Sequence, residues 1–425
     1  MSKDQLTALQ RLLTRFIWSK KPPKVKHSVM IAPQNEGGIK ALDVVSQYKA
    51  LRLPWIWRLI RSSNWNATIN MKLSQVGGIS LLIQCNFDKG TINFLPQFYK
   101  EMFIYWQEIV EHLGVDELIV WNNKNIKIAN KTIFIEELYQ HNVVYIHDFF
   151  QNRIILPYEN FCNIYQIRIS RKLYLKVTKA IQKFVNRDQH IQAILDQAKP
   201  THIRNKTRFR LLSGTWIDLR TAKSKHFYNE FLIFKTGFAS ALTQWQENYN
   251  ITEETFYSSL PRTINATNET QLIAFQFKML YNIVNNNANL KRWNIQESDE
   301  CTFCTGHNTD DVVHEFAACS WTREKITEIA REIGLSNTFR QITKTEFIFG
   351  QEDATLNNII LIIKHILHNV RQKQIPFHMS VFKAELYKRI ISDERTLTSF
   401  KFMKKWAHYR NLVREAHSYL TTFSS

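Results

Sequence analysis

Residues 301–321 read CTFCTGHNTDDVVHEFAACSW, a stretch that holds three of the five cysteines in a chain of 425 residues. The spacing within it is Cys301-x2-Cys304-x9-His314-x4-Cys319. Two thiolates separated by two residues are a usual half of a tetrahedral zinc site, and the histidine and the third cysteine offer two further ligands. Because four protein ligands leave no open coordination position, the pattern predicts a structural zinc ion (Zn2+) in a small knuckle.

The alternatives for these residues are a disulfide, a catalytic thiol or unrelated surface cysteines, and His307 is a competing ligand. An odd number of cysteines, and a start MSKDQLTALQ without the apolar core of a signal peptide, are typical of a reducing compartment. We therefore expect an intracellular location, in the cytoplasm, the nucleus or both. His314 and Cys319 are about 140° apart around a regular helix, so one of them should lie where the helix ends.

The charge of the chain indicates an anionic partner. Lys and Arg number 56 against 37 Asp and Glu, which gives a formal net charge of +19. Such an excess is unfavourable by self-repulsion unless a polyanion relieves it, and nucleic acids and anionic membrane surfaces are the usual polyanions. No run of about 18 uncharged apolar residues occurs, so the sequence favours nucleic acid and predicts no membrane partner.

Two basic segments are candidates for contact with phosphate groups. The loop SKKPPKVKH (19–27), in which two prolines interrupt any helix, carries Lys20, Lys21, Lys24 and Lys26. In AKPTHIRNKTRFRLLSG (198–214), cations alternate with other residues at Arg204, Lys206, Arg208 and Arg210. Residues two apart in an extended chain lie on one face about 6.6 Å from each other, comparable to the phosphate spacing of a nucleic-acid strand. The alternative for both segments is an ordinary solvated loop.

Hydrophobic periodicity predicts a mainly α, multi-helical fold with short β segments. Apolar residues recur at helical spacing in nine segments: 4–18, 96–113, 158–196, 225–250, 268–292, 322–333, 357–374, 379–392 and 396–420. Between residues 117 and 150, β-branched residues alternate with polar ones, which predicts short strands joined by turns at Asn122-Asn123 or Ala129-Asn130. The glycines of NEGGIKALD (35–43) predict a further turn, and Cys85 and Cys162 are expected in the core.

The cysteine–histidine stretch resembles the zinc-binding module at the carboxyl end of non-LTR (LINE/L1-like) retrotransposon reverse transcriptases. Cys301, Cys304, His314, Cys319 and Trp321 match that module one by one. Residues 9–51 and 120–150 are similar to segments that follow the polymerase palm in this family. The resemblance implies three regions: a thumb-like helical region (1–115), a wrist-like linker with short strands and basic helices (116–235), and a helical domain (236–425) that contains the zinc knuckle (298–322).

The resemblance also implies what the chain binds and what it lacks. The polymerase centre of the family uses adjacent aspartates after an aromatic strand, whereas Asp310 and Asp311 lie inside the predicted zinc loop. We therefore expect no enzyme activity, and a module that binds RNA or an RNA–DNA hybrid, with target DNA as a further candidate. The alternatives are a polymerase or nuclease with divergent acidic residues, and a decayed or host-adopted element fragment that acts through protein contacts. Whether the zinc knuckle contacts RNA or only fastens the fold stays open.

Overall fold

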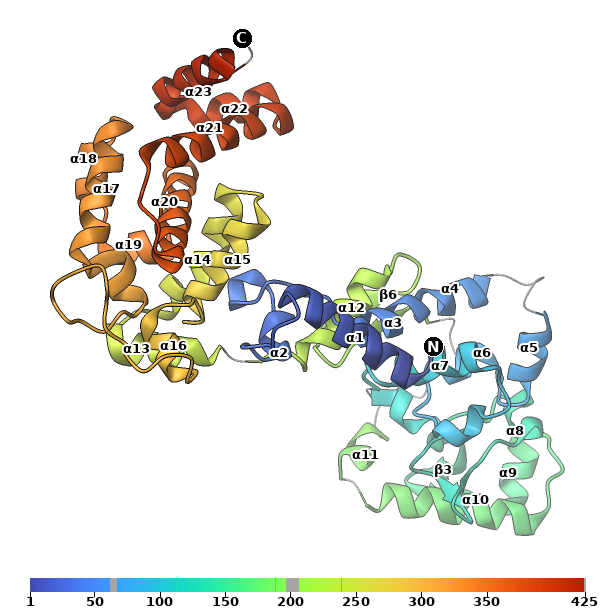
Figure 1. The fold of residues 1–425 in the computed structure, drawn as a ribbon. Coiled ribbons are helices and arrows are strands. Elements are labelled where there is room, and N and C mark those ends of the chain that lie inside the picture. Colours follow the sequence, from blue (N-terminus) through green and yellow to red (C-terminus); the bar gives the residue numbers. More distant parts are fainter. Residues whose placement is uncertain (62–66, 113, 188, 196–205, 238, 424–425) are drawn as a thin grey trace. The chain divides into compact units, whose positions relative to one another are not determined.

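The computed structural model describes residues 1–425 except 62–66, 113, 188, 196–205, 238 and 424–425 (Figure 1). The chain forms two compact units, of which the first comprises Met1–Ile17 and Leu42–Lys235 and the second comprises Trp18–Ala41 and Thr236–Ser425. Along the sequence, the chain passes between the units at residues 17/18, 41/42 and 235/236. Both units are mainly helical, and the three short antiparallel strand pairs lie in the first, so the predicted fold class is confirmed.

The first unit consists of short helices around three small strand pairs. Its α-helices are α1 (Lys3–Ile17), α3 (Val44–Arg52), α4 (Pro54–Arg61), α5 (Ala67–Ser74), α6 (Gly78–Leu82), α7 (Gln97–Gln107), α8 (Glu136–Gln140), α9 (Tyr158–Tyr165), α10 (Arg171–Val185), α11 (Gln189–Ile194) and α12 (Ser224–Ile233). Its 3-10 turns are η2 (Lys89–Ile92), η3 (Gly114–Leu118) and η4 (Ile146–Phe149). The strand pairs are β1–β2 (Lys127–Ile128, Lys131–Thr132), β3–β4 (Phe150–Gln151, Ile154–Ile155) and β5–β6 (Arg208–Arg210, Trp216–Asp218).

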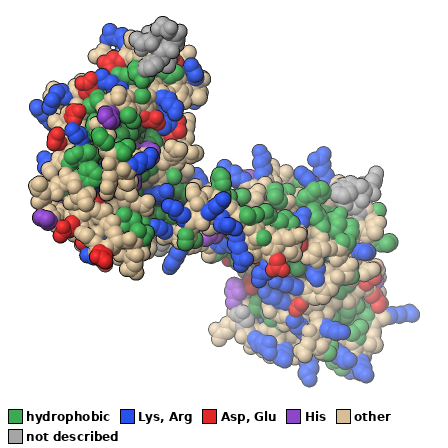
Figure 2. Space-filling model, in the orientation of Figure 1, with side chains coloured by type: hydrophobic (Ala, Val, Ile, Leu, Met, Phe, Trp, Pro, Cys, Tyr) green, Lys and Arg blue, Asp and Glu red, His purple; other side chains and the backbone are tan. Residues whose placement is uncertain are grey.

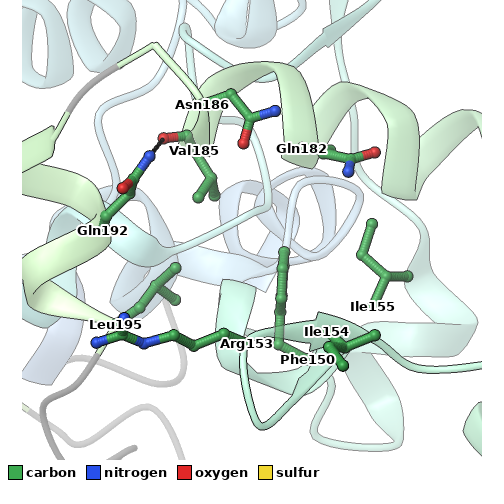
Figure 3. A pocket seen from close by; sticks show the side chains of 9 residues that line it. All are labelled: Phe150, Arg153, Ile154, Ile155, Gln182, Val185, Asn186, Gln192 and Leu195. Carbon is green, nitrogen blue, oxygen red and sulfur yellow. Dashed lines mark hydrogen bonds between the residues drawn. The ribbon is translucent and has the colours of Figure 1, made fainter.

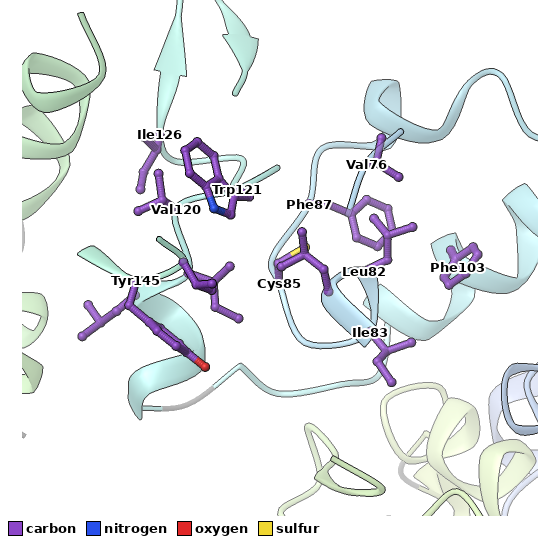
Figure 4. Close-up of a cluster of buried hydrophobic side chains, with 14 of the residues drawn as sticks. Val76, Leu82, Ile83, Cys85, Phe87, Phe103, Val120, Trp121, Ile126 and Tyr145 are labelled. Atoms are coloured by element: carbon purple, nitrogen blue, oxygen red, sulfur yellow. The ribbon is translucent and has the colours of Figure 1, made fainter. Parts of the chain in front are cut away.

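One hydrophobic cluster holds the first unit together and joins side chains between Ala50 and Phe231 (Figure 4). Its largest members include Trp106 and Trp121, both fully buried. Each indole N–H donates to a backbone carbonyl, that of Ile83 at 2.9 Å and that of Val143 at 2.6 Å respectively. The polar edge of each ring is therefore satisfied, and burial of the ring costs no hydrogen bond. Cys85 belongs to this core, as predicted.

The β1–β2 hairpin confirms one of the two predicted turns. Ala129 and Asn130 both take positive φ angles, 50° and 63°, which the two-residue turn of a tight hairpin requires. Asn152 and Arg153 do the same between β3 and β4, at 50° and 66°. Each of these two turns therefore contains one asparagine, a residue that is favoured in the left-handed region, beside a residue that is not.

Several predicted helices end earlier than their apolar pattern. Helix α7 ends at Gln107, although periodicity predicts helix to 113. Val110 instead forms a β-bridge with Leu211, and the N–H of Glu111 donates to the carbonyl of Arg210 at 2.9 Å. Pairing with a distant strand thus replaces the last helical turns. The predicted helix 158–196 is divided into α9, α10 and α11, with Gln166 in the left-handed region at φ 52° and Ser170 capping α10.

The first helix forms as predicted, but its apolar face is not a buried one. Leu6 is buried, whereas Leu9, Leu12 and Phe16 are 43%, 59% and 82% exposed. Helical spacing therefore located α1 correctly and overstated its burial.

The second unit is almost wholly helical. It begins with α2 (His27–Met30) and the turn η1 (Gln34–Glu36), and continues with α13 (Ser240–Tyr249), α14 (Glu253–Ala266), α15 (Thr270–Leu280), α16 (Asn287–Arg292), the π-helical turn η5 (His314–Ala318), α17 (Ser320–Glu332), α18 (Ser336–Gln341), α19 (Lys344–Phe349), α20 (Ala354–Lys373), α21 (Met379–Thr396), α22 (Ser399–Trp406), η6 (Ala407–Tyr409) and α23 (Arg410–Phe423). The predicted helices 225–250 and 268–292 are each divided in two.

Helix α20 is the centre of the second unit and packs against α14, α15 and α21. Its N-cap Asp353 accepts hydrogen bonds from the N–H groups of Thr355 and Leu356, and it ends at Gln374 in the left-handed region. Its side chains are buried on nearly all faces, as the apolar run predicts. This buried helix carries Arg371, which contacts two sulfurs of the cysteine–histidine cluster, and His368, which contacts Glu315 beside it.

The predicted turn at 35–43 joins the second unit through a close approach. Gly37 has φ 82° and ends η1, and its carbonyl accepts a hydrogen bond from the Tyr281 hydroxyl at 2.8 Å. A Cβ on Gly38 would lie 2.0 Å from the carbonyl oxygen of Ala32, so only glycine fits there.

Candidate functional site

The four predicted metal ligands lie together in the second unit. The ligand atoms of Cys301, Cys304, His314 and Cys319 are all within 4.8 Å of one another, and the group could hold a metal ion. The Sγ atoms of Cys301 and Cys319 are 3.9 Å apart, and Cys304 Sγ is 3.4 Å from His314 Nε2. Tetrahedral zinc, with bonds of about 2.3 Å to sulfur and 2.0–2.1 Å to nitrogen, requires separations of about 3.8 and 3.6 Å. The donor set, and the two distances given, are compatible with a tetrahedral ion, although the full group spreads to 4.8 Å.

A small hairpin positions the first two ligands. Glu300 and Thr309 form an antiparallel bridge, and the N–H of Cys301 donates to the carbonyl of Asn308 at 2.9 Å. The loop between them turns at His307, which has φ 47°. Cys304 thus lies on a loop whose two ends are fixed, so that its sulfur returns to the same centre as that of Cys301.

A π-helical turn positions the other two ligands. His314 opens the turn η5, and the N–H of Cys319 donates to the carbonyl of His314 at 2.7 Å. Bonds between residues five apart, instead of four, widen the turn. Cys319 itself is extended, with φ −60° and ψ 126°, between η5 and α17. The prediction that one of the two ligands lies where the helix ends is confirmed.

Helix α20 supplies a guanidinium group behind the ligands. Arg371 Nη1 donates to Cys319 Sγ and Nη2 donates to Cys301 Sγ, each at 3.4 Å. The same Nη2 donates to Asp310 Oδ1 at 2.5 Å, and Nε lies 3.8 Å from Glu315 Oε1. The guanidinium also lies 4.7 Å from the centre of the Phe303 ring. The Arg371 side chain is 3% exposed, so these groups satisfy a fully buried cation.

The electrostatics of this layer follow from burial and from Arg371. Burial raises the pKa of Cys301 and that of Asp310, and the positive charge of Arg371 opposes both shifts. Burial also acts to raise the pKa of Cys319, but hydrogen bonds from Thr322 and the charge of Arg371 outweigh it and lower that pKa. Three thiolates around a divalent cation carry one excess negative charge. Arg371, which contacts two of the sulfurs, offsets that charge.

The remaining polar residues of the loop have structural partners. His307 points away from the cluster, and its Nδ1 lies 3.1 Å from Glu300 Oε2 on the surface, so the competing ligand is not part of the group. Asp311 Oδ1 accepts from the N–H of His314 at 2.7 Å, and Oδ2 accepts from the Tyr249 hydroxyl at 2.6 Å. Asp311 therefore bonds the loop to Tyr249 on α13 and to the start of η5, while Asp310 bonds it to Arg371 on α20.

The basic loop 19–27 meets a tryptophan and further cations within the second unit. The ammonium of Lys24 lies over the indole ring of Trp293, and the guanidinium of Arg292 lies 5.8 Å from the centre of that ring. Burial, followed by the charges of Lys21, Arg292 and Lys278, lowers the pKa of Lys24 to about 8. We call Lys21, Lys24, Lys278, Arg292 and Trp293 the basic cluster. Lys20 and Lys26 are exposed in the same loop.

Sequence reasoning predicted two of these five residues and missed Lys278, Arg292 and Trp293. Lys278 lies on α15, Arg292 ends α16 and Trp293 follows it, more than 250 residues from the loop. The run KRW at 291–293 was the one local signal, because an aromatic residue beside two cations is typical of nucleic-acid contacts.

The second basic segment is engaged by carboxylates. Arg204 lies outside the described residues. Lys206 pairs with the buried Asp116, Arg208 Nε lies 3.5 Å from Asp218 Oδ2, and Arg210 Nε lies 3.3 Å from Glu111 Oε2. Residues 208–210 form the extended strand β5, but the charges of these side chains are largely balanced within the first unit. The phosphate contact predicted for them stays a prediction.

No protein-family model matches this chain, and no curated protein matches it either. In the described part of the chain, no helix combines the length and the apolar composition needed to cross a bilayer.

Proposed function

We propose that this chain is a nucleic-acid-binding module that holds RNA or an RNA–DNA hybrid, and that a structural zinc ion fastens its binding surface. The basic cluster carries the proposal. Lys24 and Arg292 lie at the indole ring of Trp293, and Lys21 and Lys278 lie close enough to Lys24 to repel its charge. Among the described residues, none of these four cations forms an ion pair with a carboxylate. An anion at this place would relieve repulsion that the protein itself leaves unbalanced.

The chemistry of the basic cluster suits a nucleic acid better than a simple anion. Lysine and arginine contact phosphate groups without regard to sequence. Trp293 adds a flat apolar face next to them, and stacking of bases on aromatic rings is a common contribution to single-strand binding. Lys24 now lies over that face, so a base that stacked there would displace an ammonium onto a phosphate.

The metal centre supports this surface through α16. The side chain of Asn287 donates to the carbonyl of Glu300 at 2.6 Å, and the N–H of Ala288 donates to the carbonyl of Asp310 at 3.2 Å. Lys291 Nζ lies 2.9 Å from Asp299 Oδ1. The knuckle is therefore bonded along the whole of α16, the helix that ends in Arg292 and leads into Trp293. We propose that zinc acts as a fastener here, because the knuckle residues Asp299, Glu300 and Asp310, which bond to this helix, lie close to its ligands in the chain.

The geometry gives less support to the alternatives, which are a polymerase or nuclease and a fragment that acts through protein contacts. Asp310 is paired with the buried Arg371 and Asp311 is bonded to Tyr249, so neither carboxylate is available to a two-metal centre. Among the residues that the structure describes, the cysteine–histidine cluster is the one group of three or more candidate metal ligands. The clustering of cations also favours nucleic acid over the alternative of a fragment that acts through protein contacts.

The proposal is tested by RNA binding of charge-matched variants. One variant carries Lys21→Gln, Lys24→Gln, Lys278→Gln and Arg292→Gln. The control carries Lys344→Gln, Lys388→Gln, Lys401→Gln and Lys404→Gln, four exposed cations elsewhere on the same unit. We expect the first variant to lose at least about tenfold in affinity for a labelled RNA, measured by fluorescence anisotropy, and the control to lose far less. Equal losses would contradict the proposal, because net charge alone would then explain binding.

A further inference from the structure

Two adjoining hollows run along helix α10 in the first unit. The first, of about 500 Å³, lies between α10, the β3–β4 hairpin and α11 (Figure 3). The second, of about 580 Å³, lies between α10 and the residues that lead into α9. Ile155 and Gln182 line both hollows, so the two adjoin at these side chains. We call them together the α10 groove.

The walls of the α10 groove combine aromatic, amide and cationic side chains. The Phe150 ring stands between the hairpin and α10, with the amides of Gln182 and Asn186 on the helix above it (Figure 3). The half-buried Tyr158 lines the other half of the groove, where Tyr174 adds little accessible surface because it is 2% exposed. The charged residues of the lining are Arg153, Arg171 and Lys179, against a single acidic residue, Glu159, among the described residues.

A stripe of lysines follows one rim of this groove. Lys172, Lys176, Lys179 and Lys183 recur at intervals of four, three and four residues, which places them on one line along the helix. All four are exposed, and Lys179 belongs to both the stripe and the lining. No ion pair within the described part of the chain involves any of them. Figure 2 shows Lys and Arg side chains gathered along the edge of this unit that α10 forms.

Helical geometry explains why the stripe and the groove lie side by side. Tyr174, Val177 and Ile181 face the core, and the groove residues Leu175, Gln182 and Asn186 are roughly 125° further around the axis. The lysine stripe is roughly a further 70° around, on the solvent side. From Arg171 to Asn186 the helix rises by about 22 Å, a length that holds a short stretch of an extended strand.

We propose that the α10 groove binds a segment of single-stranded nucleic acid, with the lysine stripe on the phosphates and the aromatic and amide side chains on the bases. This inference rests on the proposed function, because it adds a second nucleic-acid site on the other unit. Single strands expose the faces and edges of their bases to such a groove, whereas a duplex keeps them stacked and paired. An acidic peptide would satisfy the lysines but would leave the aromatic walls and the amides without partners.

The test uses the full chain and a labelled oligouridylate of about 12 nucleotides, with an RNA duplex of equal length for comparison. Gln182→Trp fills the groove at the point that the two hollows share, without a change of charge, and its side chain is exposed. Asn163→Trp, at an exposed position of α9 outside the groove, is the matched control. We expect Gln182→Trp to weaken single-strand binding by about tenfold, and to leave duplex binding and the control unchanged.

A second variant, with glutamine at all four stripe lysines, keeps the test decisive if Gln182→Trp perturbs folding. It should weaken single-strand binding and reduce its salt dependence. Photo-crosslinking with 4-thiouridine should label peptides within residues 150–186.

The inference is overturned if Gln182→Trp is folded and binds as the wild type does, if crosslinks are confined to the second unit, or if polyglutamate competes as well as RNA. Loss of binding in the basic-cluster variant alone would overturn this inference and leave the proposed function standing, whereas absence of binding by the wild type would overturn both.

Discussion

Arg371 donates a hydrogen bond to the sulfur of Cys319, a residue 52 positions earlier in the chain, at 3.4 Å. The contact joins the central helix of the second unit to the candidate metal centre. It also places a buried cation against two sulfurs, where it offsets the excess charge of a three-thiolate site. Outer contacts of this kind orient metal ligands and tune their affinity for the ion.

Removal of this cation should weaken both the fold and the metal site. Arg371→Met leaves the buried Asp310 without its counter-charge, for which a loss of about 3–5 kcal/mol in the free energy of unfolding is typical, whereas Glu315 keeps its contact with His368 at 2.7 Å. We expect zinc affinity to fall about 10–100-fold in a chelator competition assay. Arg371→Lys keeps the positive charge, so its stability and its zinc affinity should lie between those of the wild type and those of Arg371→Met. Wild-type zinc affinity in a folded Arg371→Met variant would show that the contact is incidental.

Loss of a ligand should release the metal and loosen the helix that it fastens. Cys304→Ser should reduce zinc, measured per chain by mass spectrometry of the metal, from one to near zero. Structural zinc sites contribute about 10–16 kcal/mol of apparent binding free energy. This is comparable to the free energy of unfolding of a whole domain. The backbone amides of residues 287–321 should therefore lose their protection from hydrogen exchange. Cys162→Ser, at a half-buried cysteine of the first unit, is the control and should retain full zinc. A Cys304→Ser chain that retained one zinc would refute the assigned ligand set.

The knuckle surface itself should be dispensable for RNA binding. Thr305→Ala with His307→Ala removes exposed side chains from the loop and spares all four ligands. If zinc acts as a fastener, this variant should bind zinc and RNA as the wild type does, whereas Cys304→Ser should lose RNA binding together with zinc at 25 °C. A large loss of RNA affinity in the surface variant would mean that the knuckle contacts RNA directly.

Lys364 predicts a pH dependence of stability in the second unit. The side chain is fully buried on α20 and donates to Gln276 Oε1 at 2.8 Å and to the Ile348 carbonyl at 3.0 Å. Burial lowers its pKa from 10.5 to about 7. Between these values the unfolded chain binds the extra proton, so this group should make stability rise with pH by up to about 1.4 kcal/mol per unit. Below pH 7 both states are protonated and this contribution is flat.

The measurement is urea unfolding of the wild type and of Lys364→Met between pH 6 and pH 9. The difference in stability between the two proteins isolates the lysine from other titrating groups. The free energy of unfolding of the wild type should increase relative to that of Lys364→Met as pH rises above 7. A constant difference across this range would contradict a depressed pKa at Lys364.

The local part of the site could be predicted from the sequence. Cys301, Cys304, His314 and Cys319 lie within 19 residues of each other, and their spacing was enough to predict the group that the structure brings together. Arg371 and Glu315 could not be predicted as its buried partners, because nothing in the sequence sets the rotation of α20 against the knuckle. For the same reason Lys24 was predicted as a phosphate contact, but its neighbours Lys278 and Trp293 were not.

The same distinction holds for the fold. Helices whose apolar faces are decided locally, such as α20 and α17, form at or near the predicted residues. Helix α7 ends early because Val110 pairs with Leu211, a contact across about a hundred residues that periodicity does not encode. Whether an apolar helix face is buried also depends on distant parts of the chain, and the exposed side chains of Leu12 and Phe16 on α1 show that periodicity does not reveal it.

The salt dependence of RNA binding tests the central claim most directly. The affinity of the wild-type chain for a single-stranded RNA is measured at a series of salt concentrations from 50 to 200 mM, beside that of the basic-cluster variant. If about six phosphates are neutralised, affinity should fall on the order of 10³-fold over this range, and the four substitutions should reduce the log–log slope by about 2 to 3. A wild-type slope near zero, or an unchanged slope in the variant, would contradict the account.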